Sequence, residues 1–236
     1  MKRKRLATKK GYWGDKKTKR VSTPYRREYY KNNSYNMYKS PRELMPQEYV
    51  TTLTYSVQGV LTNSPAAVAT KAFRSEAYDV DPALATTAMP GFAELAQLYS
   101  RYRCLSMSYD IQTCNREAFA LQVMTGFTAT NVAFNTVEYL GNAYVKSQII
   151  SAKGGLDRCR LKGSVSAVQL FGTRQAIYDD LFTGSTASAT LANAGTMNLY
   201  YSILSPSLGL TVAGGVDFNA EVRLRLQFYR PYALIG

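Results

Sequence analysis

The chain has 236 residues, and its 29 Lys and Arg outnumber its 16 Asp and Glu, which gives a formal net charge of +13. It contains no His, which excludes Ser-His-Asp and Cys-His nucleophilic systems and His-based zinc sites. Its three cysteines are too few for a zinc site built from cysteines alone, and no apolar run reaches the roughly 18 residues of a membrane span. We therefore expect no enzymatic activity, no bound metal, no cofactor and no membrane insertion. We interpret Cys104, Cys114 and Cys159 as reduced thiols, the first two at packing positions of strands.

The positive charge is concentrated in residues 1–45, which we call the arm. The arm carries 15 basic and 3 acidic residues, hence +12, whereas residues 46–236 carry 14 basic and 13 acidic residues, hence +1. Its aliphatic content is too low to offset the entropy of ordering, so we expect the arm to be disordered in the free chain. The sequence thus divides into a polycationic arm and a nearly neutral body, residues 46–236.

Basic clusters in the arm are interleaved with aromatic residues such as Tyr12 and Trp13. Cations neutralise phosphates with little sequence preference, and aromatic rings stack on unpaired bases. The combination predicts that the arm binds single-stranded nucleic acid; a merely solubilising tail is the alternative. The residues expected to bind are Lys2, Arg3, Lys4, Arg5, Lys9, Lys10, Lys16, Lys17, Lys19, Arg20, Arg26 and Arg27.

Two of these clusters are also spaced like a bipartite nuclear import signal, since short Lys/Arg runs are recognised by import receptors. The residues concerned are Lys2, Arg3, Lys4, Arg5, Lys16, Lys17, Lys19 and Arg20.

Alternation of apolar and polar residues predicts strands in the body. It is clearest over 48–60, 101–113 and 217–228, and weaker over 68–78, 118–127, 144–151, 160–171 and 196–205. Helical spacing predicts short helices over 92–99 and 175–182, and small polar residues predict loops over 184–195 and 205–215. Eight amphipathic strands favour antiparallel pairing. The predicted fold class is all-β: an eight-stranded antiparallel jelly-roll sandwich over residues 46–236, with short loop helices, behind a disordered basic arm over residues 1–45.

Two acidic pairs and one basic pair in the body are candidate sites. Asp79 and Asp81 are candidate ligands for a divalent ion, with a turn fixed by Pro82 as the favoured alternative. Adjacent Asp179 and Asp180 would not face each other on a helix, which indicates a solvated surface. Arg101 and Arg103 are predicted to contact either nucleic acid, a neighbouring subunit or a surface carboxylate.

The order of parts, a basic arm before an eight-stranded sandwich, resembles the single jelly-roll coat proteins of small icosahedral viruses. The motifs that carry the resemblance read YDVDP at 78–82, AMPGF at 88–92 and YSRYR at 99–103. They are most similar to coats of circular, Rep-encoding single-stranded DNA viruses, the circovirus-like group, some of which are themselves similar to tombusvirus-like and satellite RNA virus coats.

The resemblance implies a capsid protein that assembles with copies of itself, most simply about 60, into an icosahedral T=1 shell. It implies that the arm packages a single-stranded genome, DNA being favoured over RNA, and it does not identify the cell-surface receptor. The implied locations are the virion and, through import receptors, the host nucleus. The alternative is a cellular nucleic-acid-binding protein whose basic extension sits on a β-sandwich, which would place a charged binding surface on the body as well.

Overall fold

The computed structural model describes residues 46–63, 68–84, 87–129, 143–187, 195–204 and 211–232. All of them belong to the second of the two compact units into which the chain divides, Leu44–Gly236. The predictions made for the arm, its disorder, its nucleic-acid-binding residues and its import signal, lie outside the described residues.

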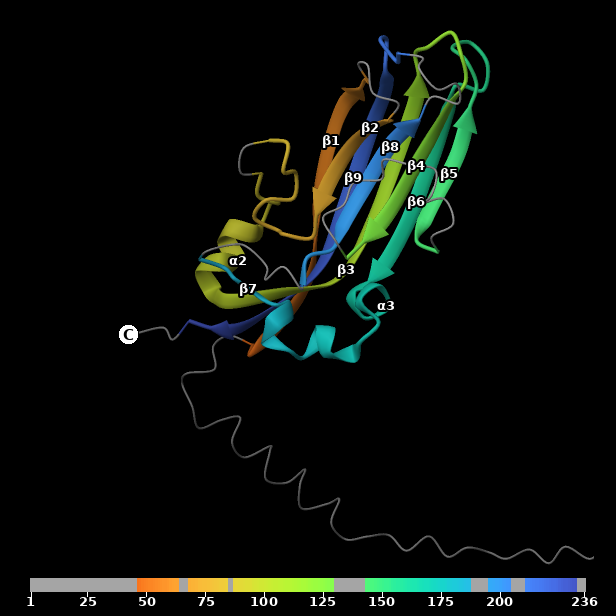
Figure 1. Ribbon diagram of the computed structural model, residues 1–236. Coiled ribbons are helices and arrows are strands. Elements are labelled where there is room, and N and C mark those ends of the chain that lie inside the picture. Colours follow the sequence, from red (N-terminus) through yellow and green to blue (C-terminus); the bar gives the residue numbers. More distant parts are fainter. Residues whose placement is uncertain are drawn as a thin grey trace, which may run out of the picture. The chain divides into compact units, whose positions relative to one another are not determined.

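Two antiparallel sheets form the body (Figure 1). The first sheet has the strand order β1-β9-β3-β6, and the second has the order β2-β8-β4-β5. In the first sheet, the strands are β1 (Glu48–Leu61), β9 (Val216–Pro231), β3 (Tyr99–Asn115) and β6 (Arg158–Ser166), and the two-residue β7 (Gly184–Ser185) also pairs with β3. In the second, they are β2 (Val68–Arg74), β8 (Asn198–Leu204), β4 (Leu121–Thr128) and β5 (Val145–Ile150).

The connections between the sheets identify the fold. The chain stays in one sheet only between β4 and β5 and between β6 and β7, and at every other connection between the described strands it crosses to the other sheet. The two four-strand orders that result are those of a jelly roll, in which Greek-key connections close two sheets over one core. The predicted fold class is therefore confirmed.

The inner face of β9 follows the predicted alternation. Its apolar side chains from Phe218 to Phe228 are buried at every second position, and the residues between them are half-buried or exposed. Because β9 lies between β1 and β3, its inward Leu224 is flanked by Leu53 and Met107. This row lies in the core, which fills the space between the two sheets.

The strand β3 contains a bulge that the alternation did not predict. The register with β9 passes from the pair Cys104–Leu226 directly to the pair Ser106–Arg225, so Leu105 has no partner. A bulge of this kind inserts one extra residue and changes which residues face inward. Leu105 is half-buried rather than a core residue, and the buried Cys104 takes the inward position on that side of the bulge.

The strand predicted over 160–171 ends early because a helix begins within it. The Ser166 hydroxyl accepts a hydrogen bond from the Gln169 backbone N–H at 3.2 Å, and the Gln169 side chain accepts one from the Ser166 backbone N–H at 3.1 Å. This reciprocal capping starts the helix α3 (Ala167–Phe171), which ends at Gly172 with a φ of 69°.

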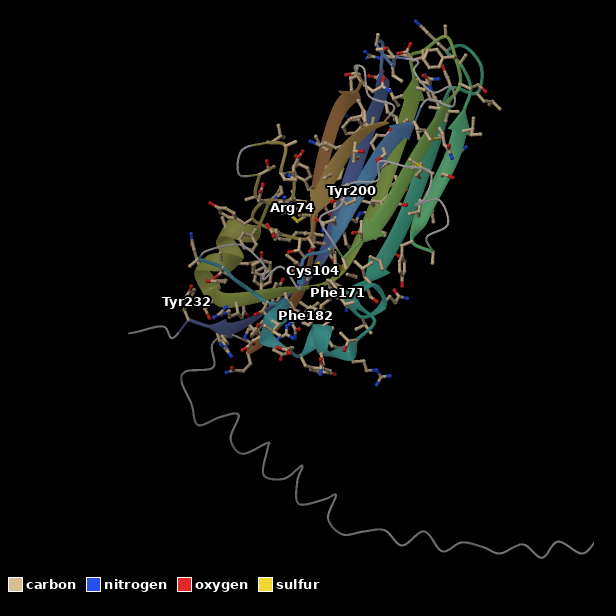
Figure 2. The ribbon with its side chains drawn as sticks, viewed as in Figure 1. Arg74, Cys104, Phe171, Phe182, Tyr200 and Tyr232 are labelled. Atoms are coloured by element: carbon tan, nitrogen blue, oxygen red, sulfur yellow. The ribbon has the colours of Figure 1, made fainter. Side chains whose placement is uncertain are left out.

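The segment predicted as one helix over 175–182 is two separate 3-10 turns. They are η2 (Arg174–Ile177), capped by the Thr173 side chain, and η3 (Asp180–Phe182), capped by the Asp179 side chain. Each cap offers the backbone a local partner that competes with a continuous helix. Phe182 packs against Phe171 of α3 with ring centroids 5.2 Å apart, and both lie at the end of the molecule that carries α3 (Figure 2).

The remaining differences from prediction concern the limits of two elements and one short strand that was not predicted. The helix predicted over 92–99 is α2 (Phe92–Leu98), and Phe92 packs edge-on against Tyr102 with centroids 5.2 Å apart. The strand predicted over 68–78 ends at Arg74, and β7 lies within the predicted loop 184–195. Figure 1 shows α2, α3 and β7 at one end of the sandwich.

The outer faces of the two sheets differ. In the second sheet, all seven residues of β8 are buried, including Tyr200 on its outward side (Figure 2). In the first sheet, the outward positions of β1 and β9 are polar and largely accessible, apart from a few apolar residues such as Val50. The described helices include none that is long and apolar enough to cross a membrane.

Candidate nucleic-acid interface

Among the described residues, the outward face of the first sheet carries the largest share of positive charge. Its outward positions hold seven cations and four acids, a net charge of +3, although residues 46–236 together have only +1. The cations are Arg101, Arg103, Arg158, Arg160, Lys162, Arg223 and Arg225, and the acids are Glu48, Asp110, Asp217 and Glu221.

This face contains an open trough of about 880 Å³, lined by residues from all four long strands. Cross-strand pairing aligns Gln58 of β1 with Asn219 of β9, and Asn219 with Gln112 of β3. We call these three side chains the amide row. Gln112 is in turn paired with Arg160 of β6, so the row ends at a guanidinium.

An ion-pair network holds the cationic end of this row. Arg160 donates two hydrogen bonds to Asp110, from Nε at 2.7 Å and from Nη2 at 2.6 Å, and Lys162 Nζ lies 2.9 Å from the same carboxylate. The hydrogen bond from Arg160 is the main cause that lowers the pKa of Asp110 to about 2. Two cations therefore share one carboxylate that stays ionised at neutral pH, and the group keeps a net charge of +1.

The other charges around the trough differ in how they are compensated. Asp217 is paired with Arg116, whose Nε lies 2.5 Å from Oδ2, so this acid adds little negative potential. Arg158 lies on β6 beside the trough, is exposed, and has no side-chain partner among the residues that the structure describes. Arg158 is thus an available cation at the rim.

Arg103 differs from two of the three sequence-based interpretations. Its side chain is only 7% exposed, and its guanidinium lies over the Tyr229 ring, 4.7 Å from the centroid. The Nε and Nη1 atoms are buried and have no hydrogen-bond partner among the residues that the structure describes. Burial excludes the surface ion pair and direct contact with nucleic acid in this conformation, and the stacking arrangement is a cation–π contact. Arg101, two residues earlier, is half-buried.

Asp81 forms a structural ion pair. Its carboxylate is fully buried, and its Oδ1 atom lies 2.6 Å from Lys71 Nζ and accepts a hydrogen bond from the Ala83 backbone N–H at 3.2 Å. Asp79 instead accepts a hydrogen bond from the Thr87 backbone N–H at 3.4 Å. Within the described ranges, no three His, Cys, Asp or Glu side chains are grouped as a metal site would require.

Asp179 and Asp180 have separate local partners. Asp179 accepts a hydrogen bond from the Leu181 backbone N–H at 2.9 Å, which is the capping contact of η3. Asp180 lies 3.3 Å from Arg230, and both of these side chains are exposed. The two carboxylates therefore act singly at the surface.

The three cysteines are free and differ in exposure. Cys104 is buried, and burial raises the pKa of its thiol to about 12. Cys114 has an outward position beside the amide row and is half-buried. Cys159 is paired with Thr113 and packs against the core, so it has the inward position on β6.

Sequence reasoning identified the arm as the candidate interface and missed the trough. The amide row joins residues that lie more than a hundred positions apart, and only the strand order and register bring them together. The available signal was the alternation itself, which assigns Gln58, Gln112 and Asn219 to the polar face of their strands.

No protein-family model matches the chain, and no curated protein matches it either. Solved structures of similar fold do exist. A semi-empty virus-like particle of Macrobrachium rosenbergii nodavirus has 11% identity and a TM-score of 0.48, with 82% of this chain and 100% of that chain covered. Mud crab tombus-like virus has 12% identity and a TM-score of 0.46, with 86% and 98% covered. Desmodium yellow mottle tymovirus has 10% identity and a TM-score of 0.41, with 82% and 94% covered. At these identities the similarity is one of fold. These similar structures do not support the narrower resemblance to circovirus-like coats.

Proposed function

We propose that the chain is a viral coat protein that assembles into a closed shell and packages a single-stranded genome with its arm. The observation that carries this proposal is the division of charge, +12 in residues 1–45 against +1 in residues 46–236, on a body with jelly-roll topology. A polycation that extends from a neutral body can neutralise packaged phosphates without making the outer surface of every copy repel its neighbours.

Exposed apolar side chains at one end of the sandwich support association between copies. Tyr49 and Leu98 are about two-fifths exposed, and Tyr232, whose backbone N–H donates to the Leu98 carbonyl at 2.9 Å, is 45% exposed (Figure 2). Tyr178 and Leu181, in the segment of η2 and η3, are more exposed still. Large apolar side chains grouped on a surface are typical of contacts with other proteins.

The direct test is electron microscopy of the purified full chain, combined with nuclease typing of the nucleic acid that it contains. We expect closed spherical shells whose nucleic acid is protected until the shells are opened. Digestion by DNase or by RNase then decides between the two genome types. Protein that stays monomeric in physiological salt, with and without nucleic acid, would contradict the proposal.

The arm is expected to supply most of the affinity for nucleic acid. Replacing Lys16, Lys17, Lys19 and Arg20 together with Gln should lower the packaged nucleic acid and reduce the slope of log affinity against log salt by about 3, since each neutralised phosphate on a single strand contributes about 0.7. Empty shells should still form, because these residues lie outside the body. Filter binding at several salt concentrations measures the slope.

The matched control exchanges Lys for Arg and Arg for Lys at the same four positions, which conserves the charge. It should leave the slope unchanged. An unchanged slope in the Gln variant would show that this cluster does not contact phosphates. Nuclear import through Lys2–Arg5 and Lys16–Arg20, and the preference for DNA over RNA, stay predictions.

A cellular nucleic-acid-binding protein is the second candidate. It predicts a charged surface on the folded body, and the outward face of the first sheet, with its net charge of +3, is such a surface. The two candidates are separated by the oligomeric state, since only a coat protein forms closed shells.

A further inference from the structure

We propose that the trough on the outward face of the first sheet is a second binding site, which holds a short stretch of single-stranded nucleic acid against the body. This inference rests on the proposed function, because the strand would belong to the packaged genome. The site consists of the amide row, with Arg158 and Arg160 at its β6 end.

The shape of the trough fits an extended chain. Adjacent strands lie about 4.8 Å apart, so the three spacings from β1 to β6 make the floor about 14 Å wide. The centre of the floor is formed by β9 and β3, whose backbone groups are paired with strands on both sides, whereas β1 and β6 are the edge strands of the sheet. A ligand that lies on the floor must therefore bind to side chains, whereas a polypeptide that extended the sheet by backbone pairing would lie beside β1 or β6 and not in the trough.

The side chains of the trough match the two parts of a nucleotide. An amide group offers both hydrogen-bond donors and an acceptor, so Gln58, Gln112 and Asn219 can each pair with the edge of any base. In a duplex the Watson–Crick edges are already paired with the opposite strand, so these amides favour a single strand. Val60, which is 46% exposed, and Cys114 lie in the next cross-strand row and give a base or sugar a less polar contact.

The charges favour a polyanion. The three acids in or next to the trough are already held by cations: Asp110 by Arg160 and Lys162, Asp217 by Arg116, and Glu221, the cross-strand neighbour of Asp110, by Arg223. Arg158 is exposed and has no side-chain partner in the described part of the chain. A phosphate at the β6 end would therefore meet Arg158 and the outer edge of the Arg160 guanidinium without displacing an existing ion pair.

The cysteines provide a test on the full-length protein. Maleimide alkylation, followed peptide by peptide with mass spectrometry, gives a separate rate for each thiol. The probe ligand is an unlabelled oligothymidylate or oligouridylate of about eight nucleotides, within the usual size of single-strand sites. Cys114 reports on the trough, and buried Cys104 is the unreactive reference. Cys159 belongs to the β6 segment that lines the trough, but its inward position directs it to the core, so it reports on the same strands from the core side.

We expect an oligonucleotide present at about ten times its dissociation constant to slow alkylation of Cys114 roughly tenfold, in proportion to the fraction of free sites. The rate at Cys159 should change less than about twofold. The variant R158Q should lose most of the protection of Cys114. The control R225Q removes another exposed cation of the same face, one that lies outside the trough, and should keep the protection.

Three results would overturn the inference. The first is equal protection in R158Q and R225Q, which would indicate shielding by strands bound to the arm. The second is no protection of Cys114 under conditions in which the oligonucleotide binds. The third is equal protection by polyphosphate of the same charge, which would remove the role of the bases.

The outcome is independent of the test of the proposed function. Closed shells with an unprotected Cys114 would leave the coat-protein proposal intact and remove the second site. A protected Cys114 in protein that never forms shells would support the second site and contradict the coat-protein proposal.

Discussion

Replacing Asp81 with Ala is expected to lower the free energy of unfolding by about 3–5 kcal/mol, the usual cost of leaving one partner of a buried ion pair uncompensated. The Asp81 side chain is fully buried, and Lys71, which would lose its partner, is only 16% exposed. The Tyr55 hydroxyl also donates to Asp81 Oδ2, at 3.4 Å. Because Tyr55 belongs to β1 and Lys71 to β2, this carboxylate joins the two sheets. Urea titration of the unassembled protein at neutral pH measures the change.

The matched control for Asp81 is its neighbour Asp79, replaced in the same way. In the described part of the chain the Asp79 carboxylate has one long hydrogen bond, to the Thr87 backbone, so its loss should cost less than about 1 kcal/mol. The double variant Lys71→Met with Asp81→Leu should be more stable than Asp81→Ala alone, since no unpaired charge remains. Equal losses in the two Asp variants, or a wild-type stability that depends on Ca²⁺, would instead favour a shared divalent ion.

Replacing Leu224 with Ala is expected to cost about 2–5 kcal/mol, the range for removing a buried Leu side chain from a packed core. Leu224 is fully buried on the central strand β9, between Leu53 of β1 and Met107 of β3. A cavity there removes contacts to both neighbouring strands, and the surrounding sheet restricts the collapse that would fill it. The same urea titration measures the loss.

The control is the next residue, Arg225, which faces outward and is exposed. Arg225→Ala should change the free energy of unfolding by no more than about 0.5 kcal/mol. Similar losses in the two variants would mean that β9 does not have the register described. The comparison therefore tests the orientation of the strand as well as the size of the effect.

The sequence predicted the long strands well because their pattern is local. In β9, residues from Phe218 to Phe228 alternate without a fault, and only one choice of face buries the apolar set. The prediction was wrong at Ala167–Phe171, where an apolar run extended the predicted strand into a segment that is helical. The Ser166 and Gln169 pair that starts the helix was visible in the sequence as a capping box, but the apolar run was given more weight.

Two other features could not be predicted in this way. The two residues of β7 are too short to form a pattern, and they are a strand only because β3 lies beside them. The trough requires the register of four strands, of which β6 and β9 come late in the chain. The arm, in contrast, is recognisable from composition alone, because its proposed role depends on the number of charges rather than on their positions.

The unpaired Leu105 has a consequence for how the chain can change in length. On one side of it, Tyr102 and Cys104 face the core, and on the other Met107 and Tyr109 do. Removing this one residue would leave Cys104, Ser106 and Met107 in succession as inward, outward and inward, opposite the consecutive Leu226, Arg225 and Leu224 of β9. Both halves of the strand would keep their faces, and only the bulge would be lost. A single deletion at Leu105 is therefore compatible with the faces of β3, whereas a single deletion well away from the bulge would turn one part of the strand over.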